Sequence, residues 1–287
     1  MNSTKKIDPI IIHSNHNNRP FSIDVNYAET GDPKPILIFL HGFKGFKDWG
    51  YFNQLSDFFA VNGLVFVKMN FSHNGTTPDH PIDFVDLEAF GNNNFSIEQD
   101  DLGKVIDWIQ SDENPVPETE MDKQRIFLAG HSRGGSAIIL KAWHDDRIKA
   151  ISSWAGLNDL DKHYTDEQLE MWRSEGVLYI DNMRTNQKMP LYIQLAEDFI
   201  ANREKFDVPA AIKELKIPIQ IVHGSNDETL PVIMAHQTKR WNHEVELVII
   251  DGGDHTFGGK HPWIHDHLPE KAKEAAEATV DFFRRCR

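Results

Sequence analysis

Residues 130–135 read Gly-His-Ser-Arg-Gly-Gly, and this short stretch decides the fold. Ser132 is the centre of a Gly-x-Ser-x-Gly pattern, between an apolar run at Arg125 to Ala129 and a helical pattern at Ser136 to Trp143. A serine in so sharp a turn has a strained backbone, and glycines two residues away on either side remove side chains that would clash. The alternative, an incidental serine in a glycine-rich turn, does not explain the flanking strand and helix. The pattern predicts a strand–turn–helix with the Ser132 hydroxyl above a sheet.

The sequence on both sides of this turn alternates between short apolar runs and amphipathic stretches. Continuous apolar runs are typical of strands buried on both faces, and an i, i+3, i+4, i+7 spacing is typical of helices. A hairpin is expected first, over 9–13 and 21–28. Further strands are expected at 36–40, 64–71, 125–129, 148–153, 217–223 and 244–250, and helices at 51–61, 136–143, 269–285 and from a capping box at 96–99. We predict an α/β fold, with a mostly parallel central sheet and helices on both faces.

One segment, 157–206, interrupts this alternation. It is polar, and Thr165 to Gln168 has the form of a capping box that begins a helix. A connection of this length without secondary structure of its own is uncommon in a compact domain. We therefore predict a single domain over 1–287, with a small and mainly helical cap insertion at 157–206.

The composition excludes several classes of protein. The chain has 287 residues, with 30 Lys and Arg against 44 Asp and Glu, so its formal net charge is −14. This charge argues against nucleic acid or an anionic membrane as a main partner. Apolar runs such as Ile36 to Leu40 are far shorter than the roughly 20 residues of a membrane helix. The only cysteine, Cys286, excludes an internal disulfide, and without a signal-peptide pattern a cytoplasmic location is the default expectation. The oligomeric state stays open.

A serine nucleophile requires a base and a group that orients the base. Two loops that follow predicted strands supply candidates. Residues 223–231 read His-Gly-Ser-Asn-Asp-Glu-Thr-Leu-Pro and contain Asp227, and residues 251–259 read Asp-Gly-Gly-Asp-His-Thr-Phe-Gly-Gly and contain His255. The carboxyl ends of parallel strands form the functional rim of such a sheet. The order Ser132, Asp227, His255 is that of one hydrolase fold, and differs from that of trypsin-like and subtilisin-like proteases.

Other residues have a functional and a structural interpretation. Asp159 also follows a predicted strand and is an alternative orienting acid, but a helix cap is the more ordinary role for it. His261, His265 and His267 have the spacing H-x₃-H-x-H, which suggests zinc. Because Pro262 interrupts the first spacing, we interpret these histidines as surface residues and predict no metal site.

These motifs together resemble the α/β-hydrolase superfamily from about Phe21 to the C-terminus. Residues 41–46, His-Gly-Phe-Lys-Gly-Phe, directly follow the strand at 36–40 and resemble the oxyanion loop of that superfamily. The loop at 223–231 resembles its acid loop, and residues 254–255 its histidine loop. Within the superfamily the likeness is to serine esterases, dienelactone-hydrolase-like or prolyl-oligopeptidase-like members with a compact cap. A serine nucleophile departs from dienelactone hydrolases proper, which use cysteine, and from dehalogenases and epoxide hydrolases, which use aspartate.

The resemblance implies a serine hydrolase that cleaves carboxylic esters of small to medium acyl or alcohol groups through an acyl-enzyme. Ser132 would be the nucleophile, His255 the base and Asp227 the acid that orients it. No cofactor is implied. A peptidase or amidase of the prolyl-oligopeptidase type, a thioesterase and a non-catalytic binding protein are the alternatives. The large N-terminal domain that usually selects peptides is not predicted, because little sequence precedes the strand at 36–40.

The remaining site residues follow from the same resemblance. The backbone N–H groups of Phe43 and Arg133 would form the oxyanion hole. Phe46 and Trp154 are expected to line the substrate pocket. His131 is interpreted as a packing residue next to the nucleophile.

Overall fold

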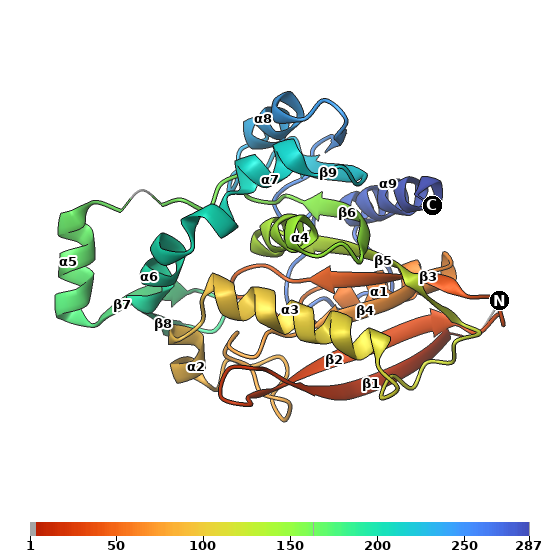
Figure 1. Cartoon of the computed structure of the whole chain (residues 1–287), viewed down its shortest axis with the longest axis horizontal. Helices are drawn as coiled ribbons and strands as arrows, with labels where there is room; N and C mark the ends of the chain where they lie inside the picture. The colour runs from red at the N-terminus through yellow and green to blue at the C-terminus, as the bar shows by residue number, and fades with distance from the viewer. Residues whose placement is uncertain (1–3, 163, 287) are drawn as a thin grey trace.

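A computed structural model describes residues 4–162 and 164–286 (Figure 1). A central eight-stranded sheet has the order β1-β2-β4-β3-β5-β6-β9-β10. The hairpin β1–β2 is antiparallel, β2 is antiparallel to β4, and the remaining neighbours are parallel. The predicted mostly parallel sheet is therefore confirmed. Its strands are β1 (Thr4–His13), β2 (Pro20–Ala28), β3 (Lys34–Leu40), β4 (Val65–Met69), β5 (Met121–His131), β6 (Ile148–Trp154), β9 (Ile219–Gly224) and β10 (Glu246–Ile250).

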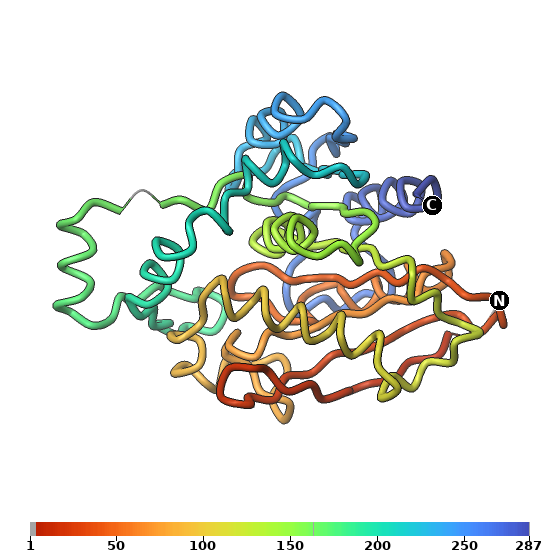
Figure 2. The backbone as a smooth tube through the Cα atoms, viewed as in Figure 1, coloured from red at the N-terminus to blue at the C-terminus, as the bar shows by residue number. Residues whose placement is uncertain are grey.

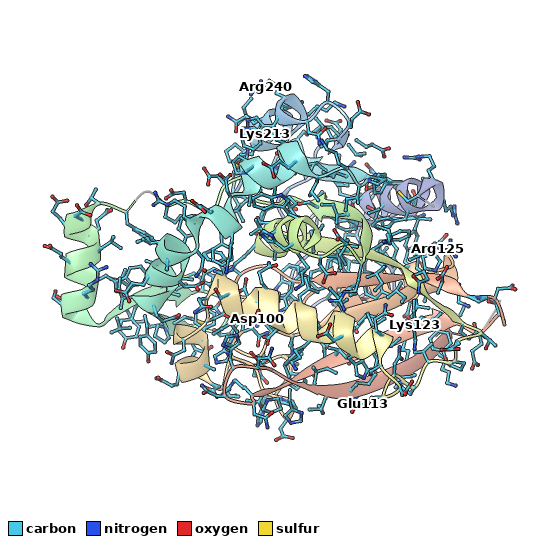
Figure 3. The ribbon with its side chains drawn as sticks, viewed as in Figure 1. Asp100, Glu113, Lys123, Arg125, Lys213 and Arg240 are labelled. Carbon is cyan, nitrogen blue, oxygen red and sulfur yellow. The ribbon has the colours of Figure 1, made fainter. Side chains whose placement is uncertain are left out.

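Helices cover both faces of this sheet, as predicted. One face packs against α3, α4, α7 and α8, of which α3 and α4 lie toward the viewer in Figure 1, and the other packs against α1 and α9. Charged side chains such as Asp100, Lys213 and Arg240 lie on the outer sides of α3, α7 and α8 (Figure 3). The helices outside the insertion are α1 (Phe52–Val61), α2 (Leu87–Gly91), α3 (Phe95–Gln110), α4 (Arg133–His144), α7 (Val208–Glu214), α8 (Ile233–Trp241) and α9 (Glu270–Arg285).

The start of α3 differs from the predicted capping box. Asn94 caps this helix, and its side chain accepts a hydrogen bond from the backbone N–H three residues further on. The two side chains of the expected box have other partners. Ser96 donates to the Asp198 carboxylate at 2.5 Å, and Gln99 Nε2 donates to the backbone carbonyl of Ala137 at 3.0 Å. Tertiary contacts thus use the residues whose sequence pattern suggested a local cap.

The segment 157–206 forms a separate group of elements at one end of the sheet. It contains α5 (Asp166–Glu175), β7 (Val177–Asn182), β8 (Gln187–Tyr192), α6 (Gln194–Ala201) and a short 3₁₀ turn (Arg203–Phe206). The predicted capping box at Thr165 is present. The antiparallel hairpin β7–β8 was not predicted, and it packs against α2. The backbone trace shows α5 standing away from the sheet, with α6 closer to it (Figure 2).

No helix in the described part of the chain combines the length and the apolar character that crossing a bilayer requires.

Candidate active site

Ser132 lies in the turn between β5 and α4. Its backbone angles, φ 55° and ψ −120°, fall in a region that residues with side chains rarely adopt. The turn brings α4 close to the end of β3. A Cβ atom on Gly134 would lie only 2.6 Å from the carbonyl oxygens of Leu40 and His41. The strand–turn–helix predicted from residues 130–135 is therefore present, and glycine is required at position 134.

The loops that carry Asp227 and His255 follow the adjacent parallel strands β9 and β10, so they meet at one edge of the sheet. His255 Nδ1 lies 2.8 Å from Asp227 Oδ2. Because a carboxylate only accepts, Nδ1 carries the proton and donates it, which leaves Nε2 as an acceptor. Ser132 and His255 line the same cavity. The structure thus brings the predicted nucleophile, base and acid to one edge of the sheet.

The Asp227 carboxylate is fully buried and richly hydrogen-bonded. Its Oδ1 accepts from the backbone N–H groups of Thr229 and Leu230 at 2.9 and 2.8 Å. Its Oδ2 also lies 3.3 Å from His223 Nε2. Burial alone favours the neutral acid, but the nearby His223 ring and the hydrogen bonds from His255 and the backbone outweigh it and hold the pKa of Asp227 below its ordinary value. The group is therefore a carboxylate at neutral pH and can stabilise a charged imidazole.

Two further histidines brace the loops of the site. His131 Nε2 donates to the backbone carbonyl of His255 at 2.7 Å, and His41 Nδ1 donates to the carbonyl of Gly42 at 2.8 Å. Burial lowers the pKa of His131 to about 3 and that of His41 to about 4. Both rings are neutral at physiological pH. His131 is thus more than the packing residue expected, since it fixes the backbone of the candidate base.

These buried histidines predict a loss of stability in acid. His41, His73 and His131 have folded-state pKa values of about 4, 4 and 3, below the value of about 6.5 in an unfolded chain. The contribution of these three rings to the free energy of unfolding is therefore fully present above about pH 6.5. It falls as the pH drops toward 4, by about 1.4 kcal/mol per pH unit for each proton taken up on unfolding. Asp101 opposes this, because burial raises its pKa to about 6 and its contribution falls as the pH rises from about 4 to 6.

Near pH 5, the three histidines take up three protons on unfolding and Asp101 releases one. The net uptake on unfolding is therefore two protons. Urea unfolding is expected to show a free energy that falls by roughly 2 to 3 kcal/mol per pH unit there. His73→Gln removes one of the protons and is expected to flatten that slope by about 1.4 kcal/mol per pH unit. A free energy that stays constant between pH 7 and 5 would show that these rings are not neutral in the fold.

The loop after β3 passes directly beside the nucleophile. A Cβ atom on Gly42 would lie 2.9 Å from Ser132 Cβ. The backbone N–H groups of Phe43 and Arg133 have no hydrogen-bond acceptor within residues 4–162 and 164–286. The N–H of Arg133 also belongs to the first turn of α4, where the helix dipole favours negative charge. Two free donors beside a hydroxyl are what the stabilisation of an oxyanion requires.

Two cavities meet at Ser132, and Phe43 borders both. The first has a volume of about 290 Å³ and is predominantly apolar. The second has a volume of about 260 Å³ and includes His255. The insertion supplies most of the apolar wall of the first cavity, through Leu157, Leu160, Tyr164, Leu191, Leu195, Ala196 and Phe199.

The expectation that Trp154 and Phe46 line the substrate pocket is wrong. Trp154 is fully buried between β6 and α9, where its Nε1 donates to Thr279 Oγ1 at 3.0 Å. Phe46 is also fully buried and packs edge-on against Phe84. Neither side chain borders the two cavities at Ser132.

Asp159 and the histidine cluster have structural partners. Asp159 Oδ1 accepts from the backbone N–H of Asp161 at 2.8 Å, so it closes a local turn, whereas His255 bonds to Asp227. His261 Nδ1 accepts from the backbone N–H of Gly50 at 2.9 Å and ties two loops together. Within the described ranges, no group of three or more His, Cys, Asp or Glu side chains is placed to hold a metal ion.

Comparison with solved structures shows the α/β-hydrolase fold. The esterase domain of a Rhodothermus marinus protein superposes with a TM-score of 0.65 at 16% identity, over 99% of both chains. A dienelactone hydrolase from Anabaena variabilis gives 0.64 at 14% identity, over 99% of this chain and 98% of its own. The acylaminoacyl peptidase of Pyrococcus horikoshii gives 0.64 at 17% identity, but this chain spans only 42% of it. No protein-family model and no curated protein matches the sequence.

Proposed function

We propose that this chain is a serine hydrolase that cleaves carboxylic esters of small to medium acyl or alcohol groups. The observation that carries the proposal is the arrangement around Ser132. A strained serine lies beside two free backbone N–H donors and shares a cavity with His255, whose Nδ1 is held by Asp227 at 2.8 Å. The names of the superposed structures, an esterase domain and a dienelactone hydrolase among them, support the same reaction class. The single cysteine, Cys286, suits a reducing cytoplasm, the location that we propose.

The mechanism that we propose has two steps. Ser132 Oγ attacks the ester carbonyl carbon while its proton passes to His255 Nε2, and Asp227 stabilises the resulting imidazolium. The N–H groups of Phe43 and Arg133 hold the oxyanion as it forms. His255 then gives its proton to the leaving alcohol, and an acyl-enzyme remains on Ser132. In the second step His255 activates a water molecule, which releases the acid and restores the hydroxyl.

The positions of the two cavities support an assignment of the two halves of the substrate. The base that takes the proton from Ser132 returns it to the leaving group, so the alcohol lies on the side of His255. His255 borders the second cavity and not the first. The acyl group therefore occupies the apolar cavity of about 290 Å³ beneath the insertion.

This assignment predicts a preference for acyl chain length. Activity on p-nitrophenyl acetate to octanoate is expected to exceed activity on the palmitate, because a cavity of about 290 Å³ is too small to hold the whole of a long chain. Leu195→Trp narrows the cavity and is expected to lower kcat/KM on the octanoate about tenfold, with little effect on the acetate. Ile200→Trp, an exposed position on the same helix, is the control. A palmitate preference, or equal losses on both esters, would place the acyl group elsewhere.

The competing reaction classes are separated by a substrate panel. p-Nitrophenyl esters of increasing length, aminoacyl-anilides and acyl-thioesters are assayed side by side at equal enzyme concentration. The proposal predicts the highest kcat/KM on the oxygen esters. Hydrolysis of anilides alone would assign the chain to the peptidases, and a preference for thioesters would assign it to the thioesterases.

A further inference from the structure

Four charged side chains are buried beneath the loop that carries Phe43. Lys47 Nζ lies 2.6 Å from both Asp24 Oδ2 and Asp48 Oδ2, and Lys68 Nζ pairs with the same two carboxylates. Each lysine thus bridges both aspartates. The side chains of Lys47, Lys68, Asp24 and Asp48 are only 6%, 4%, 10% and 16% exposed. We call Asp24, Lys47, Asp48 and Lys68 the four-charge cluster.

The stability of the fold does not explain this cluster. Removing a charged group from water costs several kcal/mol, and well-packed apolar side chains of similar size are often as stabilising as a buried ion pair. Burial opposes the charge of Lys47, but the carboxylates of Asp24 and Asp48 outweigh it and raise its pKa. Burial likewise opposes the charge of Asp48, but Lys68 and Lys47 outweigh it and lower its pKa. Among the residues that the structure describes, Asp24 Oδ1 has no hydrogen-bond partner, and leaving it unpaired adds a further free-energy cost. A closed ring of charges instead makes the geometry of the contacting segments specific. Every contact is attractive only when positive and negative side chains alternate around the ring.

The geometry of the sheet shows what this ring specifies. Asp24 on β2 and Lys68 on β4 are directly opposite each other in the antiparallel ladder, so the sheet presents a fixed pair of opposite charges. The loop presents a second pair, the consecutive residues Lys47 and Asp48. Each charge of the loop meets charges of opposite sign on the sheet. A shift of the loop by one residue relative to β2 and β4 would separate Lys47 from Asp24 or bring like charges together. The charge pairing therefore fixes the register of the loop against these two strands.

The same loop is held in a strained conformation. Lys44, next to Phe43, has φ 57°, which is the left-handed region that residues with side chains avoid. Such strain persists only where the surroundings determine the backbone at several points. Asn74 Nδ2 donates to the carbonyl of Gly45 at 3.3 Å, and the backbone N–H of Lys47 donates to Asn70 Oδ1 at 2.7 Å. The four-charge cluster is a further anchor on the C-terminal side of Phe43.

We propose that the four-charge cluster positions the loop 41–48 and thereby sets the place of the Phe43 N–H beside Ser132. Its residues are positioning residues, since none of them borders the cavities at Ser132. Its effect on turnover depends on the esterase activity proposed above, but its effect on the loop does not.

The test removes the charges of the sheet without leaving a charge unpaired. In Asp24→Asn with Lys68→Met, the loop residues Lys47 and Asp48 still pair with each other, but nothing fixes their register. Loss of one oxyanion donor typically costs about 10² to 10³ in kcat, so we expect a drop of about 10²-fold on p-nitrophenyl butyrate with KM within threefold of wild type. The affinity for butylboronic acid, which forms a tetrahedral adduct with a serine, is expected to fall by a similar factor. Glu29→Gln, which breaks the exposed Lys5–Glu29 pair, is the control.

Hydrogen–deuterium exchange of the backbone amides of residues 41–48 measures how firmly the loop is held, independently of activity. It is expected to be faster in the double variant and unchanged in Glu29→Gln, with both variants folded by circular dichroism. If the double variant does not fold, Asp48→Asn is measured instead, with about a tenfold drop in kcat expected. Exchange, kcat and boronate affinity that all stay within threefold of wild type in a folded variant would overturn the proposal, and so would a raised KM with unchanged kcat. If the wild-type protein cleaves no ester but exchange is faster in the double variant, the positioning role of the cluster would be supported and the proposed esterase activity would be contradicted.

Discussion

Ser132→Ala is expected to lower kcat on p-nitrophenyl butyrate by at least about 10⁴-fold, since removal of the nucleophile from a comparable triad lowers kcat by about 10⁶-fold. Without Oγ no acyl-enzyme forms, and only the oxyanion donors and the cavity remain to assist direct attack by water. The fold is expected to be intact, because the Ser132 side chain makes no hydrogen bond as a helix cap. Initial rates over a range of ester concentrations, with enzyme folded by circular dichroism, measure the effect.

Ser225→Ala is the matched control, since Ser225 lies on the same rim of the sheet in the loop after β9. Its kcat is expected to remain within threefold of wild type. A Ser132→Ala enzyme that retains activity within tenfold of wild type would exclude Ser132 as the nucleophile.

Asp227→Asn is expected to lower kcat by about 10⁴-fold while the protein stays folded. The amide has a donor where the carboxylate only accepts, so it favours the tautomer of His255 that presents a proton to Ser132. It also removes the negative charge that stabilises the imidazolium. KM is expected to change little, because Asp227 is fully buried beneath His255.

Asp159→Asn is the matched control for the acid. Asp159 closes a local turn by accepting from the Asp161 N–H, and an asparagine oxygen accepts equally well. Its kcat is expected to stay within threefold of wild type on the same ester. The reverse pattern, with activity lost in Asp159→Asn and kept in Asp227→Asn, would assign the orienting role to Asp159.

The parts of the site that could be predicted from sequence are those in which local residue types fix the backbone. Gly130 and Gly134 permit the turn at Ser132, and a parallel sheet places the loops with Asp227 and His255 at one edge whatever else the chain does. These features depend on short-range sterics and on the handedness of strand–helix–strand connections. They are therefore visible in a single sequence.

The apolar cavity at Ser132 could not be predicted in the same way. A residue at the end of a buried strand, such as Trp154, can face either the cavity or the helices behind the sheet, and no periodicity distinguishes the two. The wall of the apolar cavity at Ser132 comes instead from Leu191, Leu195 and Phe199 of the insertion, whose position depends on how the insertion folds back over the sheet. The signal that was missed is the apolar spacing of Leu195 and Phe199 on α6.

The four-charge cluster could not be predicted from the sequence for a related reason. From the sequence alone, Lys47 and Asp48 have the pattern of ordinary loop residues. Asp24 and Lys68 have the pattern of polar residues in strands near a sheet edge. Only the pairing of β2 with β4 places Asp24 opposite Lys68, and only the path of the loop after β3 brings the other pair onto them. Charge complementarity between segments this far apart has no local pattern.

The central claim is that the Ser132 hydroxyl is the nucleophile. A fluorophosphonate probe that reacts with activated serines tests it directly, with the modified peptide located by mass spectrometry. We expect one adduct per chain, on the peptide that contains Ser132, and no labelling of the Ser132→Ala variant. Labelling that persists in Ser132→Ala, or an adduct on a different serine in the wild-type protein, would contradict it.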